Sequence, residues 1–148
     1  MNRKILCVCS GNTCRSPMMQ AILQHSLKKL GVNGVSIESA GTIKESTSQR
    51  INEHAALELR KRGFSLEQHM SRYVSNIGEL TVFSLVLCAG LEQATEVRAL
   101  CPEIADRIQI VNAESGGIPD PWGQGPEAYE KCASMIEAAM DKISRTLK

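Results

Sequence analysis

Residues 9–16, Cys-Ser-Gly-Asn-Thr-Cys-Arg-Ser, bring a thiol, a guanidinium and a hydroxyl into one short stretch. The apolar run Ile5-Leu6-Cys7-Val8 before it is typical of a buried strand, and Pro17 after it is favoured in the first turn of a helix. We therefore predict a loop between a strand and a helix. In such a loop the backbone N–H groups point inward at the positive end of the helix and bind a phosphate-like anion. We call residues 9–16 the phosphate loop.

The side chains of the phosphate loop predict covalent phosphoryl transfer. In the predicted loop, Cys9 lies near inward-pointing backbone amides, a helix N-terminus and Arg15, and each of these favours the thiolate form. We therefore expect Cys9 to be the nucleophile. Arg15 offers a planar fork of donors for two phosphoryl oxygens, and Ser16 can donate a hydrogen bond that eases the later departure of sulfur. This chemistry proceeds through a phosphocysteine and needs no metal. The phosphate-binding residues are predicted to be Ser10, Gly11, Asn12, Thr13, Cys14, Arg15 and Ser16.

The same spacing has an ordinary interpretation. Cysteine is among the most buried residue types, and a cysteine-rich strand followed by a Ser-Pro helix start is compatible with packing alone. Short motifs also recur by chance. The position between a strand and a helix is the context that the chemistry requires, and it favours the catalytic interpretation.

A carboxyl group follows much later in the chain, in Asp120-Pro121-Trp122. A leaving alkoxide or phenolate departs from phosphorus with difficulty unless it is protonated, and a positioned carboxylic acid accelerates this step by roughly 10²–10⁴-fold. Asp120 can then activate the water that hydrolyses the phosphocysteine. Pro-Asp-Pro is also a good turn sequence by itself, but the presence of Cys9 favours the general acid.

Strands and helices alternate along the chain. Apolar runs predict strands over 5–8, 35–39, 83–88 and 108–111, and helical spacing predicts helices over 18–30, 51–62, 91–100 and from 127 onwards, with a weak helical turn over 75–80. Polar loops are expected over 39–49 and 115–126. This order predicts an α/β fold with a parallel sheet covered by helices on both faces and a ligand at the carboxyl ends of the strands.

Length and composition limit the remaining choices. A chain of 148 residues with 43% hydrophobic content is expected to form one domain, 1–148, and a net charge of +1 offers no basic field for nucleic acid or an acidic membrane. A short apolar run after Met1 does not form a leader, so we expect a cytoplasmic protein whose six cysteines are reduced. The three histidines are scattered and no Cys-x-x-Cys pair is present, which argues against a structural metal.

Taken together, the motifs closely resemble the low-molecular-weight protein tyrosine phosphatases. The resemblance implies a four-stranded parallel sheet of the flavodoxin-like type, hydrolysis of phosphotyrosine or aryl phosphates, and no cofactor. It implies Cys9 as nucleophile, Arg15 as phosphate clamp and Asp120 as general acid. The motifs that carry it, in chain order, are Val8-Cys9-x-Gly11-Asn12-x-Cys14-Arg15-Ser16-Pro17, Ser39-Ala40-Gly41-Thr42, His69-x-Ser71-Arg72 and Asp120-Pro121-Trp122.

The same resemblance implies support for the phosphate loop and a redox role. A polar network that maps onto Asn12, Ser16, Ser39 and His69 would hold the loop rigid, because a loop with all its amides inward needs partners. Cys14 would form a reversible disulfide with Cys9 that protects the nucleophile. From the residues alone, a surface loop histidine is the preferred interpretation of His69. For Cys14, a small loop-packing residue is as good an interpretation as a redox role.

The chain also departs from the family pattern at the expected substrate pocket. Counting without gaps places Glu45 where an aromatic or large apolar wall is usual, and Trp122 stands alone where many members carry two aromatics. Gly90 replaces a common acidic residue after the third strand, with Glu92 nearby. We therefore expect turnover of phosphotyrosine proteins or small aryl phosphates that is weak or shifted in specificity. We expect the protein to be a monomer or a weak dimer.

Two rival functions remain open. One is arsenate reduction on the same scaffold, with a thiol relay through Cys14, Cys88 and Cys101, although Cys88 also fits a core strand. The other is a slow phosphate-binding regulatory module. Asp120 argues against both, because arsenate reduction has no alcohol to protonate and a binding module has no use for an acid above the leaving group.

Overall fold

A sheet of four parallel strands forms the centre of the molecule. The computed structural model describes residues 2–148 and orders the strands β2-β1-β3-β4. Their bounds are β1 (Arg3–Cys9), β2 (Val35–Gly41), β3 (Leu85–Cys88) and β4 (Ile108–Ile110). Because all strands are parallel, their carboxyl ends meet at one edge, and β1 delivers Cys9 to the middle of it. The predicted α/β fold with a four-stranded parallel sheet is confirmed.

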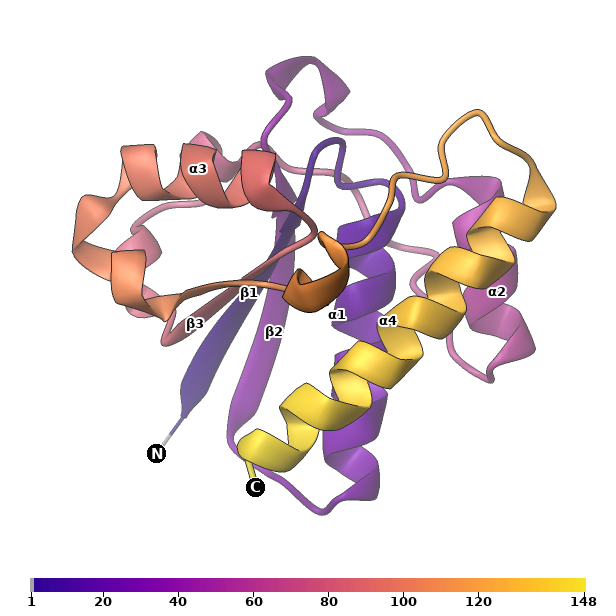
Figure 1. Cartoon of the computed structure of the whole chain (residues 1–148), viewed down its shortest axis with the longest axis horizontal. Coiled ribbons are helices and arrows are strands. Elements are labelled where there is room, and N and C mark those ends of the chain that lie inside the picture. Colours follow the sequence, from indigo (N-terminus) through magenta and orange to yellow (C-terminus); the bar gives the residue numbers. More distant parts are fainter. Residues whose placement is uncertain (1) are drawn as a thin grey trace.

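Helices cover both faces of the sheet, as Figure 1 shows. On one face lie α1 (Arg15–Lys29), α2 (Glu53–Lys61) and α4 (Pro126–Thr146), and on the other lies α3 (Leu91–Leu100). Side chains alternate along β1, so that Ile5 and Cys7 pack under the first group while Leu6 and Val8 pack under α3. The sheet therefore separates two apolar cores.

The predicted elements differ from the observed ones mainly at their ends. We expected a loop to begin at Ser39, but β2 continues to Gly41, because Ser39, Ala40 and Gly41 each pair with a residue of β1. The third strand begins at Leu85 rather than at Phe83, which instead closes a 3₁₀ turn with its N–H on the Leu80 carbonyl at 3.1 Å.

Helix starts shift for local reasons. α1 begins at Arg15, before Pro17, because Pro17 lies within the first turn, where a missing N–H leaves no bond unmade. α2 begins at Glu53, since the Asn52 side chain accepts hydrogen bonds from the N–H groups of His54 and Ala55 at 2.8 and 3.2 Å.

Short 3₁₀ turns occur in several of the connections between these elements. Two of them, Val74–Asn76 and Leu80–Val82, overlap the two ends of the single weak turn that we predicted over 75–80, whose middle is not helical. The turns at Lys44–Ser46, Pro102–Arg107 and Ala113–Ser115 carry no strong periodic signal in the sequence. Over residues 2–148, none of the helices is both long and apolar enough to cross a bilayer.

Candidate active site

The phosphate loop leaves the end of β1 and leads directly into α1. Asn12 lies in the left-handed region, with φ of 57°, and is fully buried. Asparagine tolerates this region better than most residues. The end of β2 approaches the loop so closely that a Cβ on Gly41 would lie 2.5 Å from the Ser10 carbonyl oxygen. Glycine is therefore required at Gly41 for the sheet edge and the phosphate loop to meet.

The thiol of Cys9 lies at the bottom of a cavity of about 350 Å³ that this loop helps to form. Its sulfur is 3.0 Å from the Ser16 hydroxyl oxygen, and the Asn12 backbone N–H donates to it at 3.3 Å. Cys9 is 2% exposed, so only a group that enters the cavity reaches the sulfur. The residues that line the cavity are Cys9, Ser10, Gly11, Thr13, Cys14, Arg15, Ile43, Ser46, Gln49, Asp120 and Trp122.

A polar network behind the phosphate loop joins the four residues that the resemblance implied. The Asn12 side-chain amide donates to the Ser16 hydroxyl at 2.7 Å and to the Ser39 hydroxyl at 3.0 Å. The Asn12 side-chain oxygen accepts from the backbone N–H of Arg72 at 2.9 Å. His69 bonds the Asn12 carbonyl through Nε2 at 2.7 Å. The loop is thus held from α1, β2 and the segment after α2.

His69 acts in this network as a neutral donor. Burial lowers its pKa below the ordinary value, the hydrogen bond to the Asn12 carbonyl opposes this, and the charge of Arg72 lowers the pKa further. Because a carbonyl oxygen only accepts, the proton of the neutral ring lies on Nε2. His69 is therefore not a free surface residue but is bonded to the centre of the loop.

Gln20 belongs to the same network, although sequence reasoning missed it. Its Nε2 donates to the Ile37 carbonyl at 3.1 Å, and its Oε1 accepts from the Ser39 hydroxyl at 2.8 Å. The available signal was its place four residues after Ser16 on a helix, which puts both side chains on one face.

Arg15 crosses the cavity from the start of α1. Its Nη1 donates to the Ile118 carbonyl at 2.9 Å and its Nη2 to the Ser10 hydroxyl at 3.2 Å. Nη2 also lies 3.6 Å from Oδ2 of Asp120, which brings the carboxyl of a distant loop to the guanidinium. Arg15 is 7% exposed, so its charge acts in a largely desolvated place.

Asp120 forms a local turn and also reaches the cavity. Its Oδ1 accepts from the Trp122 backbone N–H at 3.1 Å, and its carbonyl accepts from the Gln124 side chain at 2.8 Å, which makes a local turn. Its other oxygen faces Arg15 across the cavity mouth. The turn and the cavity position coexist because the two carboxyl oxygens serve different partners.

The predicted pocket position of Glu45 needs a correction. Glu45 lies in the 3₁₀ turn Lys44–Ser46 and is exposed, and the neighbours Ile43 and Ser46 line the cavity in its place. The turn rotates successive side chains, which counting without gaps does not represent. Trp122 does line the cavity but is 74% exposed.

The cysteines of the predicted arsenate relay lie in two different cores. Cys14 packs with Cys9 on the α1 face, where the neighbouring Cys132 thiol and burial raise the pKa of Cys14. Cys88 and Cys101 pack on the α3 face. Burial, only partly offset by the charge of Arg98, raises the pKa of Cys88 to about 12. The sheet separates Cys88 and Cys101 from the cavity, which Cys14 lines, and this does not favour a relay through the three thiols.

Comparisons with known proteins agree on one family of phosphatases. The model of the family described as low molecular weight phosphotyrosine protein phosphatase matches residues 4–148. A protein-arginine-phosphatase of Geobacillus stearothermophilus is 30% identical over 152 residues, covering 100% of this chain and 98% of the relative. The low molecular weight protein-tyrosine-phosphatase Etp of Escherichia coli strain K12 is also 30% identical, over 97% of this chain and 93% of its own.

Solved structures agree with the sequence matches. The low molecular weight protein tyrosine phosphatase from T. tengcongensis superposes with a TM-score of 0.88 at 28% identity, covering 98% of this chain and 99% of that one. The cysteine, arginine and aspartate gathered around one cavity thus occur in a chain that matches such phosphatases over nearly its whole length. The chain belongs to the low molecular weight phosphotyrosine protein phosphatase family.

Proposed function

We propose that this protein hydrolyses phosphorylated side chains of proteins through a phosphocysteine on Cys9. The observation that carries the proposal is the arrangement around the sulfur. The Ser16 hydroxyl lies 3.0 Å from it, the Asn12 amide 3.3 Å from it, and Arg15 and Asp120 meet at the mouth of the same cavity. This arrangement supplies a nucleophile, an anion clamp and an acid in one place.

In the first step the Cys9 thiolate attacks phosphorus. The bond between phosphorus and the leaving oxygen breaks, and its electron pair takes the proton of the Asp120 carboxylic acid. The equatorial oxygens rest on the loop amides and on Arg15, whose 3.6 Å contact with Asp120 is then replaced by a contact with the phosphoryl group. The products are the free alcohol or phenol and a phosphocysteine.

In the second step water replaces the sulfur. The Asp120 carboxylate removes a proton from water as its oxygen bonds to phosphorus, and the phosphorus–sulfur bond breaks. The Ser16 hydroxyl donates to the departing thiolate and stabilises it. Inorganic phosphate then leaves, and Cys9 returns to its starting state.

Phosphotyrosine and aryl phosphates form the first candidate substrate class. Trp122 provides an apolar ring at the mouth, and Ile43, whose backbone N–H bonds the phosphate loop, provides an aliphatic surface. Among the described residues that line the cavity, Trp122 alone is aromatic, so one wall of an aryl slot consists of aliphatic and polar groups. We therefore expect aryl phosphates to be hydrolysed with modest selectivity.

Phosphoarginine is a second candidate, favoured by the polar part of the same lining. The Thr13 hydroxyl, the Gln49 side chain and the Asp120 carboxyl can accept hydrogen bonds from a guanidinium, whereas a phenyl ring has no donor for them. The Geobacillus stearothermophilus relative that matches the full chain is a protein-arginine-phosphatase. In this case Asp120 would protonate the leaving nitrogen.

One panel of substrates tests the function and separates the candidates. Phosphate release is measured from a phosphotyrosine peptide, a phosphoarginine peptide, phenyl phosphate and 4-nitrophenyl phosphate, beside an arsenate assay with a thiol reductant. The ratio of kcat/KM for the two peptides decides the substrate class. Oxidation of the reductant by arsenate without release of phosphate from any substrate would overturn the proposal.

Two variants test the roles of individual residues in the same panel. Cys9→Ser should abolish hydrolysis while vanadate binding, measured by calorimetry, is largely kept, because the amides and Arg15 remain. Asp120→Asn should slow phenyl phosphate by about 10²–10⁴-fold and 4-nitrophenyl phosphate much less, since nitrophenolate leaves without a proton. Equal losses for both esters would exclude the acid role.

A further inference from the structure

One side of the cavity is a loop whose two ends are fixed differently. Residues 43–49, which we call the wall loop, contribute Ile43, Ser46 and Gln49 to the lining. The first end is bonded to the phosphate loop, because the N–H groups of Thr42 and Ile43 donate to the carbonyls of Cys9 and Ser10 at 3.1 and 3.0 Å. At this end the wall loop moves only with the phosphate loop itself.

The far end of the wall loop depends on Ser71. The Gln49 N–H donates to the Ser71 hydroxyl oxygen at 2.8 Å, and that hydroxyl donates in turn to the Ser46 carbonyl. The backbone of Ser71 makes two more bonds, accepting from the Ser48 N–H and donating to the Gln49 carbonyl, each at 2.8 Å. Ser71 is 2% exposed, so water does not compete for these groups.

The conformation of the wall loop requires such an anchor. Ser48 has a φ of 65°, in the left-handed region that disfavours serine. Ser46 also packs near Gly11, since a Cβ on Gly11 would lie 3.5 Å from the Ser46 hydroxyl oxygen. A strained backbone that touches the phosphate loop keeps its shape only when surrounding bonds determine it.

We propose that Ser71 is a positioning residue for the wall loop and thereby for the leaving group of the substrate. The proposal rests on the proposed function. Its neighbours have a different task, because His69 and the Arg72 N–H both bond Asn12 of the phosphate loop. The segment 69–72 thus holds the phosphoryl site through its ends and the leaving-group side through Ser71.

The physical basis is that one hydroxyl is both donor and acceptor between two turns of the wall loop. Without it, the Gln49 N–H and the Ser46 carbonyl lose their partner while the backbone bonds of residue 71 remain. The wall loop then samples a wider range of positions. Contacts of Ser46 and Gln49 with a large leaving group weaken, whereas Ile43 at the fixed end and the bonds of the phosphate loop to phosphorus oxygens do not change.

Ser71→Ala tests the proposal with substrates of different size. We expect kcat/KM for the phosphopeptide that the wild type prefers to fall about 5- to 20-fold, mainly through KM, because buried bonds of this kind have effects of that order. The kcat/KM for 4-nitrophenyl phosphate and the inhibition constant of vanadate should stay within about twofold of the wild-type values. Ser71→Thr, which keeps the hydroxyl, should restore the ratio between the two substrates.

Ser144→Ala is the matched control. Ser144 is fully buried and donates to the Asp141 carbonyl at 2.8 Å in the last turns of α4, far along the chain from the wall loop. Its loss removes a buried hydroxyl without affecting the cavity, so both substrates should respond alike. If Ser71→Ala lowers kcat/KM for both substrates by the same factor, or weakens vanadate inhibition in parallel, the proposal is wrong.

Amide hydrogen exchange separates this proposal from the proposed function. Exchange at Gln49, whose N–H loses its acceptor, should rise in Ser71→Ala, and exchange at Ser48, whose bond to the carbonyl of residue 71 remains, should rise less. Both should remain at the wild-type level in Ser144→Ala. Unchanged exchange with unchanged substrate ratios would overturn the role of Ser71 in an active enzyme. A wild-type protein that releases no phosphate would instead overturn the proposed function, and the exchange data would still decide whether Ser71 anchors the loop. Ser71→Cys, with a weaker donor and acceptor of similar size, provides the same test if Ser71→Ala does not fold.

Discussion

Gln20 fixes the proton of Ser39 in the polar network that supports the nucleophile, whereas the Arg72 N–H orients the Asn12 amide. The Ile37 carbonyl can only accept, so Nε2 of Gln20 faces it and Oε1 faces Ser39. The Ser39 hydroxyl then uses its one proton on Gln20 and accepts from Asn12. Asn12 donates its other amide proton to Ser16. The proton of Ser16 then has two acceptors, the Cys9 sulfur at 3.0 Å and the more distant Ala40 carbonyl at 3.5 Å.

At the scale of this residue we predict a selective loss of turnover. Gln20→Leu removes the acceptor that fixes the Ser39 proton, so Ser39 is a less well ordered acceptor for the Asn12 amide. The same amide holds the Ser16 hydroxyl beside the sulfur, and that hydroxyl becomes less well ordered in turn. We expect kcat to fall roughly 3- to 10-fold, as for the loss of one part of a buried network, with KM nearly unchanged. Steady-state kinetics with 4-nitrophenyl phosphate measure this.

The control for this prediction lies on the same helix. Gln24 is exposed and in α1, so Gln24→Leu changes the same side chain without touching the network. Its kinetics should match those of the wild type. A fall in kcat as large as that of Gln20→Leu would contradict the role of Gln20.

At the scale of elements, the segment between α2 and the turn Val74–Asn76 connects the phosphate loop to the wall loop. It has little regular structure, yet His69, Ser71 and Arg72 bond partners on the loops that surround the cavity. The segment is irregular because His69, Ser71 and Arg72 must bond partners in three different directions. Side chains on a helix or strand follow a fixed period and do not provide these directions.

We predict that His69 of this segment makes the stability of the protein depend on pH. His69 has a lowered pKa in the folded protein, against an ordinary value of 6.5, so the unfolded chain takes up the proton first as pH falls. The contribution of neutral His69 to stability is therefore complete above 6.5 and decreases below it. Urea unfolding at about pH 7.5 and about pH 5.5 should show the free energy of unfolding decreasing toward acid.

A variant isolates His69 from the other histidines. His69→Gln keeps an N–H donor for the Asn12 carbonyl but has no group that titrates in this range. The difference in unfolding free energy between the two pH values should be smaller in this variant than in the wild type. An unchanged difference would show that His69 does not contribute to it.

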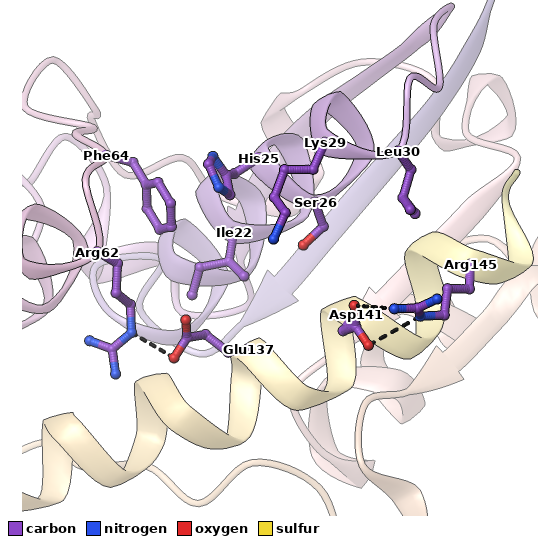
Figure 2. Close-up of a pocket in the computed structure, with 10 residues that line it drawn as sticks. All are labelled: Ile22, His25, Ser26, Lys29, Leu30, Arg62, Phe64, Glu137, Asp141 and Arg145. Atoms are coloured by element: carbon purple, nitrogen blue, oxygen red, sulfur yellow. Dashed lines mark hydrogen bonds and ion pairs between the residues drawn. The ribbon is translucent and has the colours of Figure 1, made fainter.

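At the scale of the whole molecule, α2 and α4 are tied by a charged cluster on the side of the α1 face. Figure 2 shows Arg62 paired with Glu137 of α4, at one end of a cavity of about 270 Å³ between α1 and α4. Arg62 also bonds Glu58 at 2.7 Å, and Lys61 bonds Glu58 at 3.0 Å. Burial raises the pKa of Glu58, but the bonds to Arg62 and Lys61 outweigh it and lower the pKa overall.

This cluster predicts a loss of stability without a loss of chemistry. Glu58→Gln should lower the free energy of unfolding at neutral pH by roughly 1.5–3 kcal/mol, because a buried charged acceptor is lost. Glu67→Gln is the control, since Glu67 is 67% exposed and 3.9 Å from Arg60. Urea unfolding compares the variants, and kcat should equal the wild-type value in both. Equal stability of the two variants would contradict the prediction.

Much of the architecture was predictable because its signals are local. The run of apolar residues before Cys9, the proline after Ser16 and the helical spacing that follows each depend on neighbours in the chain. The exact end of β2 was not predictable, since Ser39 to Gly41 become strand only by pairing with β1. Glu45 was misplaced because a single 3₁₀ turn decides which side chain faces the cavity.

The sequence by itself determined the chemical groups, their order and the alternation of strands and helices, because spacing and periodicity are properties of the chain. Only the tertiary structure decided which groups meet. Asp120 reaches Arg15, Gln20 reaches Ser39 and Ser71 reaches Gln49 through contacts between segments far apart in the sequence. Such contacts depend on how the segments pack. Local patterns put Gln20 on the helix face of Ser16 and predicted Asp120 at the site, but they did not identify the partner of either side chain.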